Sequence, residues 1–178
     1  MIVTINEITR NDIPTINRWR HDREIIDYLG APFRFINVET DENWFESYMK
    51  NRHVQVRCGI YLGSESKLVG VVYLTDIDVL NRNAELSILL GDKTKRNKGI
   101  GSIAVKHMLR HAFGDLNLER VYLRVLEKNR RAIAFYKKLG FVLEGTLRKV
   151  IYKNSKYHNM LMMSILRNEY RNDYCKGV

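Results

Sequence analysis

Short stretches of alternating hydrophobic and polar residues recur along the first half of the chain. The first covers residues 2–8, where β-branched side chains favour a strand. Residues 55–62 and 68–77 show the same pattern on either side of residues 63–66, which have the composition of a turn. We therefore expect these two stretches to form an antiparallel hairpin, followed by a further strand over residues 82–90.

Helical spacing of apolar residues marks the N-terminal region. Asn11 or Asp12 is positioned to cap a helix that ends near His21. The next stretch, residues 23–37, contains glycine and proline breakers, and we expect it to be irregular. Thr40 is expected to open a second helix. Its large apolar residues recur at helical spacing and are expected to be core: Trp44, Phe45, Tyr48 and Met49.

Strand and helix patterns alternate in the second half of the chain. Residues 84–126 read as strand, helix and strand, which predicts a crossover connection and parallel pairing of the two strands. Asn129 is positioned to cap the next helix and Gly140 to end it. The remaining segments are expected to be a strand from residues 141–145, a hairpin turn within residues 149–158 and a last strand over residues 159–166.

A basic, glycine-containing loop separates the strand ending at Leu90 from the next helix. Gly99 and Gly101 allow the backbone to approach a ligand closely. A helix that begins there adds unpaired N–H groups and the positive end of its dipole. These features are typical of an anion site, most naturally one for phosphate. The loop carries four positive side chains: Lys93, Lys95, Arg96 and Lys98.

Two known phosphate motifs can be compared with this loop. A Walker loop requires Lys after its last glycine, whereas Ser102 follows Gly101 here. Residues 99–104 fit the dinucleotide fingerprint G-x-G-x-x-A, but that fingerprint follows its strand directly, and here the basic loop intervenes. A nicotinamide-dependent oxidoreductase stays open as an alternative, as does an ordinary solvated turn before a helix.

Two segments resemble the signatures of one enzyme superfamily. Residues 96–101, RNKGIG, resemble the R/Q-x-x-G-x-G/A pyrophosphate loop of the GNAT superfamily of N-acetyltransferases. Residues 129–141, NRRAIAFYKKLGF, resemble its second signature, N-x-x-A-I-x-F-Y-x-K-x-G-F. The resemblance covers nearly the whole chain. It is strongest to the branch that holds ribosomal-protein, spermidine and sugar-nucleotide amine acetyltransferases.

The resemblance implies both a fold and a reaction. The implied fold is α/β (α+β), a single domain over residues 1–178 with a mixed, twisted sheet of about seven strands, flanking helices and a central βαβ crossover. The implied enzyme is an acyltransferase. It moves an acetyl group from its co-substrate acetyl-CoA to a primary amine of a small molecule or a protein N-terminus, by direct transfer in a ternary complex. Strands that separate at their carboxyl ends would open a slot beside both signatures.

The same resemblance assigns residues to acetyl-CoA. The loop would hold the pyrophosphate through backbone N–H groups and positive charge. A backbone N–H of Leu89 or Leu90 would face the thioester carbonyl. The second signature would contact the pantetheine arm and a phosphate. The implied set is Ile88, Leu89, Leu90, Arg96, Asn97, Lys98, Gly99, Ile100, Gly101, Ser102, Asn129, Ala132, Phe135, Tyr136 and Lys138.

Amine acetylation also needs proton transfer. The amine must lose a proton before it can attack, and the leaving thiolate benefits from a nearby proton donor. The resemblance assigns the role of proton donor to Tyr136. From the sequence alone, the alternative is that Tyr136 is only a half-buried aromatic side chain on a helix. Glu85 is the candidate base, because it begins the strand that leads to the thioester; a surface ion pair is its alternative.

The acceptor amine is less constrained by the sequence. Spermidine acetyltransferases use acidic residues near a Glu-Glu-Pro segment, whereas residues 29–34 read LGAPFR here. Aromatic residues in this stretch either pack under a loop or line an acceptor pocket. A net charge of +10 favours an anionic or neutral acceptor over a polycation. Carboxylates that could still hold a cationic acceptor are Glu39, Asp41, Glu42, Asp76 and Asp78.

Composition narrows the remaining function classes. No apolar run approaches the roughly 20 residues that span a bilayer. Two cysteines far apart indicate an intracellular protein with reduced thiols, and we expect it to be cytoplasmic. Assembly into a homo-oligomer stays open. His107 and His111 lack a third ligand, so we expect no metal site. The basic charge keeps a nucleic-acid-binding domain open as an alternative, although no recognised nucleic-acid motif is present.

Overall fold

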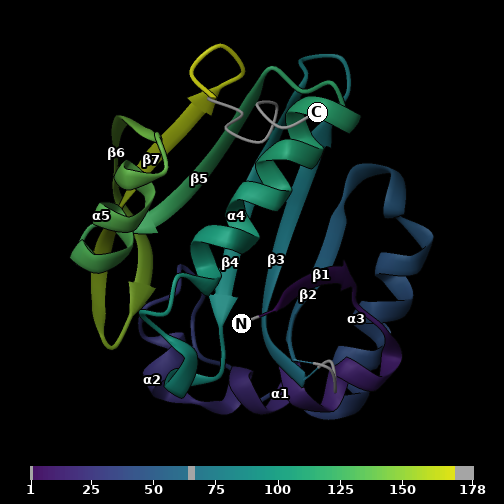
Figure 1. Cartoon of the computed structure of the whole chain (residues 1–178). Coiled ribbons are helices and arrows are strands. Elements are labelled where there is room, and N and C mark those ends of the chain that lie inside the picture. The colour runs from purple at the N-terminus through teal and green to yellow at the C-terminus, as the bar shows by residue number, and fades with distance from the viewer. Residues whose placement is uncertain (1, 64–66, 171–178) are drawn as a thin grey trace.

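The computed structural model describes residues 2–63 and 67–170, and its strands form one twisted sheet (Figure 1). The order across the sheet is β1-β2-β3-β4-β5-β7-β6. The expected mixed sheet of seven strands is therefore confirmed. The strands are β1 (Val3–Glu7), β2 (Val56–Leu62), β3 (Lys67–Asp78), β4 (Asn83–Leu90), β5 (Arg120–Leu126), β6 (Val142–Lys153) and β7 (Lys156–Leu166).

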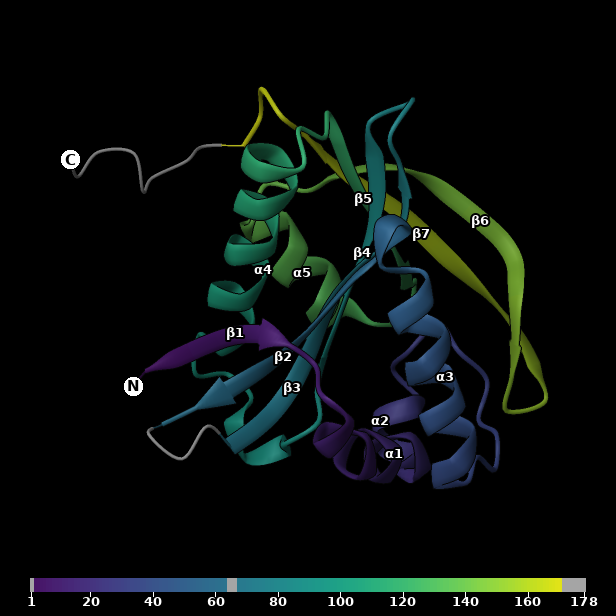
Figure 2. The same cartoon turned by 90° about the vertical axis from the view of Figure 1, so that its right-hand side faces the viewer.

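Helices cover both faces of the sheet. Figure 2 shows α4 and α5 on one side and α1, α2 and α3 on the other. The helices are α1 (Ile13–His21), α2 (Arg23–Ile26), α3 (Val38–Lys50), α4 (Ile100–Arg110) and α5 (Arg130–Lys138). Short 3-10 turns lie at Arg10–Asp12, Arg52–Val54 and Lys93–Lys95, and a π-helical turn at His111–Asp115 extends α4.

All neighbouring strands pair antiparallel except β4 and β5, which pair in parallel around α4. This confirms the crossover expected over residues 84–126. The last hairpin is tighter than expected: β6 and β7 continue to within two residues of each other. Asn154 and Ser155 both have positive φ there, as a two-residue primed turn requires.

The two faces of the sheet carry separate apolar clusters. Under α4 and α5, Met108 and Ile133 pack with strand residues such as Leu86 and Leu123. On the opposite face, a smaller cluster joins α1 and α3 to the sheet and includes Ile13, Ile16, Phe45, Tyr48 and Val71. The smaller cluster covers only part of its face, and Glu85, Ser87 and Arg124 of the central strands β4 and β5 are exposed or partly exposed on the uncovered part.

Two expectations for the N-terminal half need correction. Residues 23–26 form the helix α2 and are not irregular, because the Asp22 carboxylate accepts hydrogen bonds from the N–H groups of Glu24 and Ile25. The second helix begins at Val38 and not at Thr40, because Asn37 is its N-cap and accepts from the Thr40 N–H. The expected turn at residues 63–66 lies mostly outside the described residues.

Candidate active site

The parallel strands β4 and β5 separate soon after they begin. Their register contains three pairs, Asn83 with Arg120, Ala84 with Val121 and Glu85 with Tyr122. Residues 86–90 of β4 therefore have no partner on β5. In Figure 1 the two strands diverge toward their carboxyl ends, with α4 in front of them. This is the slot that the sequence predicts between the two signatures.

The contact between β4 and β3 shows in which direction the backbone N–H and C=O groups of β4 point. A Cβ built on Gly70 of β3 would lie 2.5 Å from the Leu89 carbonyl oxygen, so that carbonyl faces β3. Successive residues of a strand direct their N–H and C=O groups to opposite sides, so the N–H groups of Ile88 and Leu90 face the slot. Of the two N–H groups expected to face the thioester carbonyl, that of Leu89 faces β3 instead, and only that of Leu90 faces the slot. The Leu90 carbonyl faces the slot as well, because the Arg96 guanidinium donates to it at 3.3 Å.

The basic loop leads directly into the N-terminus of α4. Asn97 and Gly99 both have positive φ, 62° and 78°, and a Cβ at Gly99 would meet no atom within 4 Å. Gly99 is the N-cap of α4, and its open surroundings leave the first N–H groups of the helix accessible. This arrangement of exposed donors and positive charge fits a pyrophosphate.

The positive side chains of this loop differ in their partners. Lys93 forms ion pairs with Asp22, at 2.8 Å, and with Glu24, at 2.6 Å, so it ties the loop to α2. Lys98 is exposed and forms no ion pair among the described residues, and the Arg96 guanidinium reaches only a carbonyl. Arg96 and Lys98 are therefore the charges of the predicted set that remain available to an anion.

The two signatures meet across the slot. Arg131 on α5 donates to the side-chain oxygen of Asn97 at 2.7 Å, which links α5 to the loop. A Cβ on Gly101 would lie 3.5 Å from the Phe135 ring and 3.7 Å from Leu90, so the first turn of α4 packs directly against both. Segments more than 30 residues apart in the sequence thus form one surface.

Asn129 is confirmed as the cap of α5. Its side-chain oxygen accepts from the Ala132 N–H at 3.1 Å, and its amide nitrogen donates to the Tyr28 carbonyl at 3.2 Å. The helix ends before Gly140, whose φ is 95°. Lys138, on the last turn of α5, is exposed.

Tyr136 is more buried than the sequence alone would indicate. Its side chain is 8% exposed and contacts the rings of Phe135 and Phe141, with centroids 5.2 and 5.6 Å away. Burial raises the pKa of the Tyr136 phenol above its ordinary value. No described protein group forms a hydrogen bond with its hydroxyl. A buried hydroxyl without a partner is costly, which is typical of a group kept for a ligand.

Glu85 lies at the last β4–β5 pair, where the slot begins. Its side chain is 13% exposed, and both carboxylate oxygens accept from Arg124, at 2.9 and 2.6 Å. The ion pair that the sequence left as an alternative is thus present. Tyr122, opposite Glu85, has its pKa raised by burial and then by the negative charges of Glu85 and Asp76.

The carboxylates suggested for a cationic acceptor are not all available. Asp41 is fully buried, pairs with Arg20 and accepts from the Asn17 amide at 2.7 Å, so it belongs to the α1–α3 interface. Asp78 accepts from both nitrogens of Asn81 at 2.7 Å, and these bonds lower its pKa. The other three carboxylates of this set, Glu39, Glu42 and Asp76, are exposed or partly exposed and form no ion pair among the described residues.

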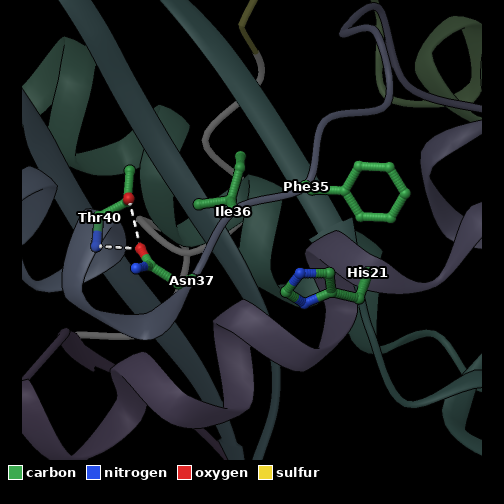
Figure 3. Close-up of a pocket in the computed structure, with 5 residues that line it drawn as sticks. All are labelled: His21, Phe35, Ile36, Asn37 and Thr40. Carbon is green, nitrogen blue, oxygen red and sulfur yellow. Dashed lines mark hydrogen bonds between the residues drawn. The ribbon is translucent and has the colours of Figure 1, made fainter.

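An open cavity of about 480 Å³ lies between the end of α1 and the start of α3 (Figure 3). Phe35 and Ile36 come from the breaker-rich stretch, and both line the cavity together with His21, Asn37 and Thr40. The Phe35 ring is 88% exposed. Phe35 therefore borders a cavity, and its ring is not packed under a loop.

A second open cavity, of about 600 Å³, lies beside the ends of β2 and β3. Arg57 lines it, and the sequence pattern singles out neither Arg57 nor Arg124 as a site residue. Strand alternation places each on one face, but only the pairing of strands shows what each faces. Among the described residues, no three His, Cys, Asp or Glu side chains form a group that could hold a metal, and His111 contacts Asp115 at 2.8 Å.

An open mixed sheet with a splayed parallel pair, a basic loop and a helix N-terminus at the splay defines an acyl-CoA-dependent acetyltransferase architecture. The family model described as acetyltransferase (GNAT) domain matches residues 3–142. The chain therefore belongs to the GNAT acetyltransferase family and is an acetyl-CoA-dependent N-acetyltransferase. The resemblance drawn from the two signatures is confirmed.

Characterised relatives align over almost the whole chain. A spermidine N(1)-acetyltransferase of Vibrio cholerae is 28% identical over 172 residues, 96% of each chain. A spermidine N(1)-acetyltransferase of Escherichia coli is 30% identical over 94% of this chain and 88% of its own. The crystal structure of the Vibrio cholerae spermidine N-acetyltransferase with CoA and spermine has a TM-score of 0.88, at 26% identity, covering 94% of this chain and 97% of that chain. None of the helices described for the present chain is long and apolar enough to cross a membrane.

Proposed function

We propose that this chain transfers the acetyl group of acetyl-CoA directly to a primary amine of a small molecule or protein N-terminus, in the slot between β4 and β5. The observation that carries the proposal is the loss of β4–β5 pairing after Glu85. That loss leaves the N–H groups of Ile88 and Leu90 without strand partners on the slot side. Bound acetyl-CoA supplies an activated acyl group, and these N–H groups are suited to polarise its carbonyl.

The loop and α4 would hold the pyrophosphate. Backbone donors from Asn97 to Ser102, together with Arg96 and Lys98, supply the N–H groups and charge that this group requires. Phe135 and Ala132 would flank the pantetheine arm on α5, and Lys138 would reach a phosphate. Asn129 would act mainly by fixing the start of α5, since its oxygen already caps that helix.

Tyr136 and Glu85 are the proposed proton-transfer groups. The Tyr136 phenol is protonated at neutral pH, as a tyrosine with an ordinary or raised pKa is, so its hydroxyl is available to donate to the departing thiolate. Glu85 would accept the amine proton through water from the opposite side of the sheet. Because Arg124 holds both of its oxygens, Glu85 would act as a fixed rather than a freely rotating base.

Calorimetric titration with acetyl-CoA, followed by a thiol-release assay over polyamines, amino sugars, sugar-nucleotide amines, amino acids and peptides, tests the proposal. We expect saturable binding that Gly101→Trp abolishes, because an indole would fill the space between α4 and Phe135. Gly101→Ala is the matched control, because its Cβ would make only ordinary contacts. Binding to the Trp variant with unchanged affinity would exclude this slot.

Spermidine is a second candidate acceptor. The similarity to two spermidine acetyltransferases over nearly their full lengths favours it. The burial of Asp41 and the turn contacts of Asp78 remove two of the carboxylates that could hold a polycation here. The same thiol-release assay, with spermidine as one acceptor, decides between the candidates. We propose a cytoplasmic enzyme without a nucleic-acid ligand; a gel shift with duplex DNA tests the latter.

A further inference from the structure

Arg57 is a half-buried cation on the face of the sheet that α1 and α3 cover in part. Its guanidinium lies 4.8 Å from the ring centres of both Trp44 on α3 and Tyr73 on β3, and 5.9 Å from that of Tyr48. Burial lowers the pKa of this guanidinium, although it remains protonated at neutral pH. The aromatic stack therefore fixes a positive charge in one orientation.

The hydrogen-bonding capacity of Arg57 is largely unused. Its Nε donates to the Gln55 side chain at 2.8 Å. Within residues 2–63 and 67–170, neither terminal nitrogen forms a hydrogen bond or an ion pair with a protein group. A half-buried guanidinium without an ion-paired carboxylate is costly to the fold, because the aromatic rings and the charge of Asp76 repay the desolvation of its charge only in part. The two terminal nitrogens form the fork that binds carboxylate or phosphate in a bidentate manner.

The unused fork borders the cavity of about 600 Å³. The other lining residues are Asn51, Val54, Gln55, Thr75, Asp76, Ile77 and Asp78. The Asp78 carboxylate is held by Asn81, and Asp76 is exposed at the rim, whereas Arg57 is half-buried. Arg57 therefore places a positive charge within the cavity, and the Asp76 carboxylate at the rim favours the charged form of Arg57 without forming an ion pair with it.

The cavity lies on the same face of the sheet as the proposed reaction centre. Arg57 pairs with Tyr73, which pairs with Ser87 on the part of β4 that borders the slot. Paired residues project from one face, and two strand spacings place the backbones of Arg57 and Ser87 about 10 Å apart. Glu85 lies two residues before Ser87 and therefore also faces this side.

We infer that Arg57 is a specificity residue that binds an anionic oxygen group, a carboxylate or a phosphate, on the acceptor amine. This inference rests on the proposed function and names its substrate class: small amines that carry such a group a few bonds from the nitrogen. The amine end lies toward Glu85 and the slot, and the anionic end lies in the cavity. The Arg57 fork donates two charge-assisted hydrogen bonds to it.

Paired acceptors test the inference. Acetyl-CoA turnover is measured with an amino acid and its carboxamide, and with glucosamine 6-phosphate and glucosamine, while calorimetry on the CoA-loaded protein measures binding of all four. We expect at least one anionic member to exceed its neutral partner by about 10- to 100-fold in kcat/KM, as expected for loss of a charged hydrogen-bonded pair. The carboxylate pair and the phosphate pair distinguish the two sources of the anionic group.

Substitutions assign the preference to Arg57. Arg57→Gln should remove the preference for the anionic member and leave the neutral member nearly unchanged, and Arg57→Lys should restore part of it. Arg52→Gln is the matched control, since Arg52 is 55% exposed, pairs with Glu7 and does not line the cavity. If the role of Arg57 were purely structural, Arg57→Gln would lower kcat/KM equally for both members of a pair.

Three results would overturn the inference: no preference within either pair in turnover or binding, equal losses in Arg57→Gln, or spermidine preferred over every anionic amine. These results are separable from failure of the proposed function, because acetyl-CoA binding and its loss in Gly101→Trp are measured independently.

Discussion

Arg124 holds Glu85 through two parallel hydrogen bonds, Nε to Oε1 at 2.9 Å and Nη2 to Oε2 at 2.6 Å, at the point where β4 and β5 separate. The pair comes from adjacent strands whose registers bring Glu85 opposite Tyr122, two residues before Arg124. The carboxylate is fixed in direction, and its negative charge is partly balanced. Whether this carboxylate accepts the amine proton can therefore be tested separately from the ion pair.

Glu85→Gln should lower kcat/KM for the amine by about 100-fold or more, as loss of a general base does, with acetyl-CoA affinity nearly unchanged. Arg124→Gln keeps the Glu85 carboxylate and breaks the same ion pair, so it should lower kcat/KM much less than Glu85→Gln does. Steady-state kinetics with purified variants measure both. Equal losses in the two variants would assign Glu85 to the ion pair alone.

Tyr136→Phe should lower kcat by about 10- to 100-fold while acetyl-CoA binding, measured by calorimetry, stays within a few-fold. The same substitution should leave the free energy of unfolding unchanged or raise it by up to about 1 kcal/mol, because it removes a buried hydroxyl without a partner. Urea unfolding measures that change. A large loss of stability with unchanged turnover would contradict the proposed proton donor.

The buried Lys153 should make the free energy of unfolding depend on pH. Its ammonium on β6 donates to the carbonyls of Ile26 and of Leu29, the latter at 2.8 Å, and burial lowers its pKa below 10.5. The folded chain therefore binds fewer protons than the unfolded chain just below pH 10.5, and the free energy of unfolding should rise with pH in that range.

Lys153→Met isolates this contribution. The difference in urea-unfolding free energy between the native chain and this variant should increase as the pH approaches 10.5. Lys156, exposed in the same hairpin, gives the control Lys156→Met, for which the difference should stay flat. A flat difference for Lys153→Met as well would show that burial does not perturb its titration.

Gly91→Ala should destabilise the fold by about 1–3 kcal/mol, because a Cβ there would overlap the Trp19 indole that packs α1 against the loop after β4. Gly114→Ala is the matched control, since a Cβ at Gly114 meets no atom within 4 Å. Thermal unfolding of the two variants gives the comparison. A stable Gly91→Ala variant would mean that Trp19 can move away at little cost.

Local sequence patterns predicted much of the fold. Strand alternation, the cap at Asn129 and the glycine at Gly140 each depend on residues close in the chain, and the structure has all three. The boundary errors have local causes too: Asp22 and Asn37 are both good caps whose side chains compete with neighbouring candidates for the helix start.

The amino-acid sequence by itself therefore determined the class of enzyme. Both signatures are contiguous segments, and their own glycines and helix caps set their backbone conformation. Only the tertiary structure decided which side chains are free to act. Arg124 orients Glu85 and partly balances its charge, Arg20 pairs with the buried Asp41, and the two terminal nitrogens of Arg57 have no hydrogen-bond partner among the described residues. These outcomes depend on strand register and helix packing between distant segments. A shift of one residue would turn a strand side chain to the other face of the sheet and a helix side chain by about 100° around the helix axis.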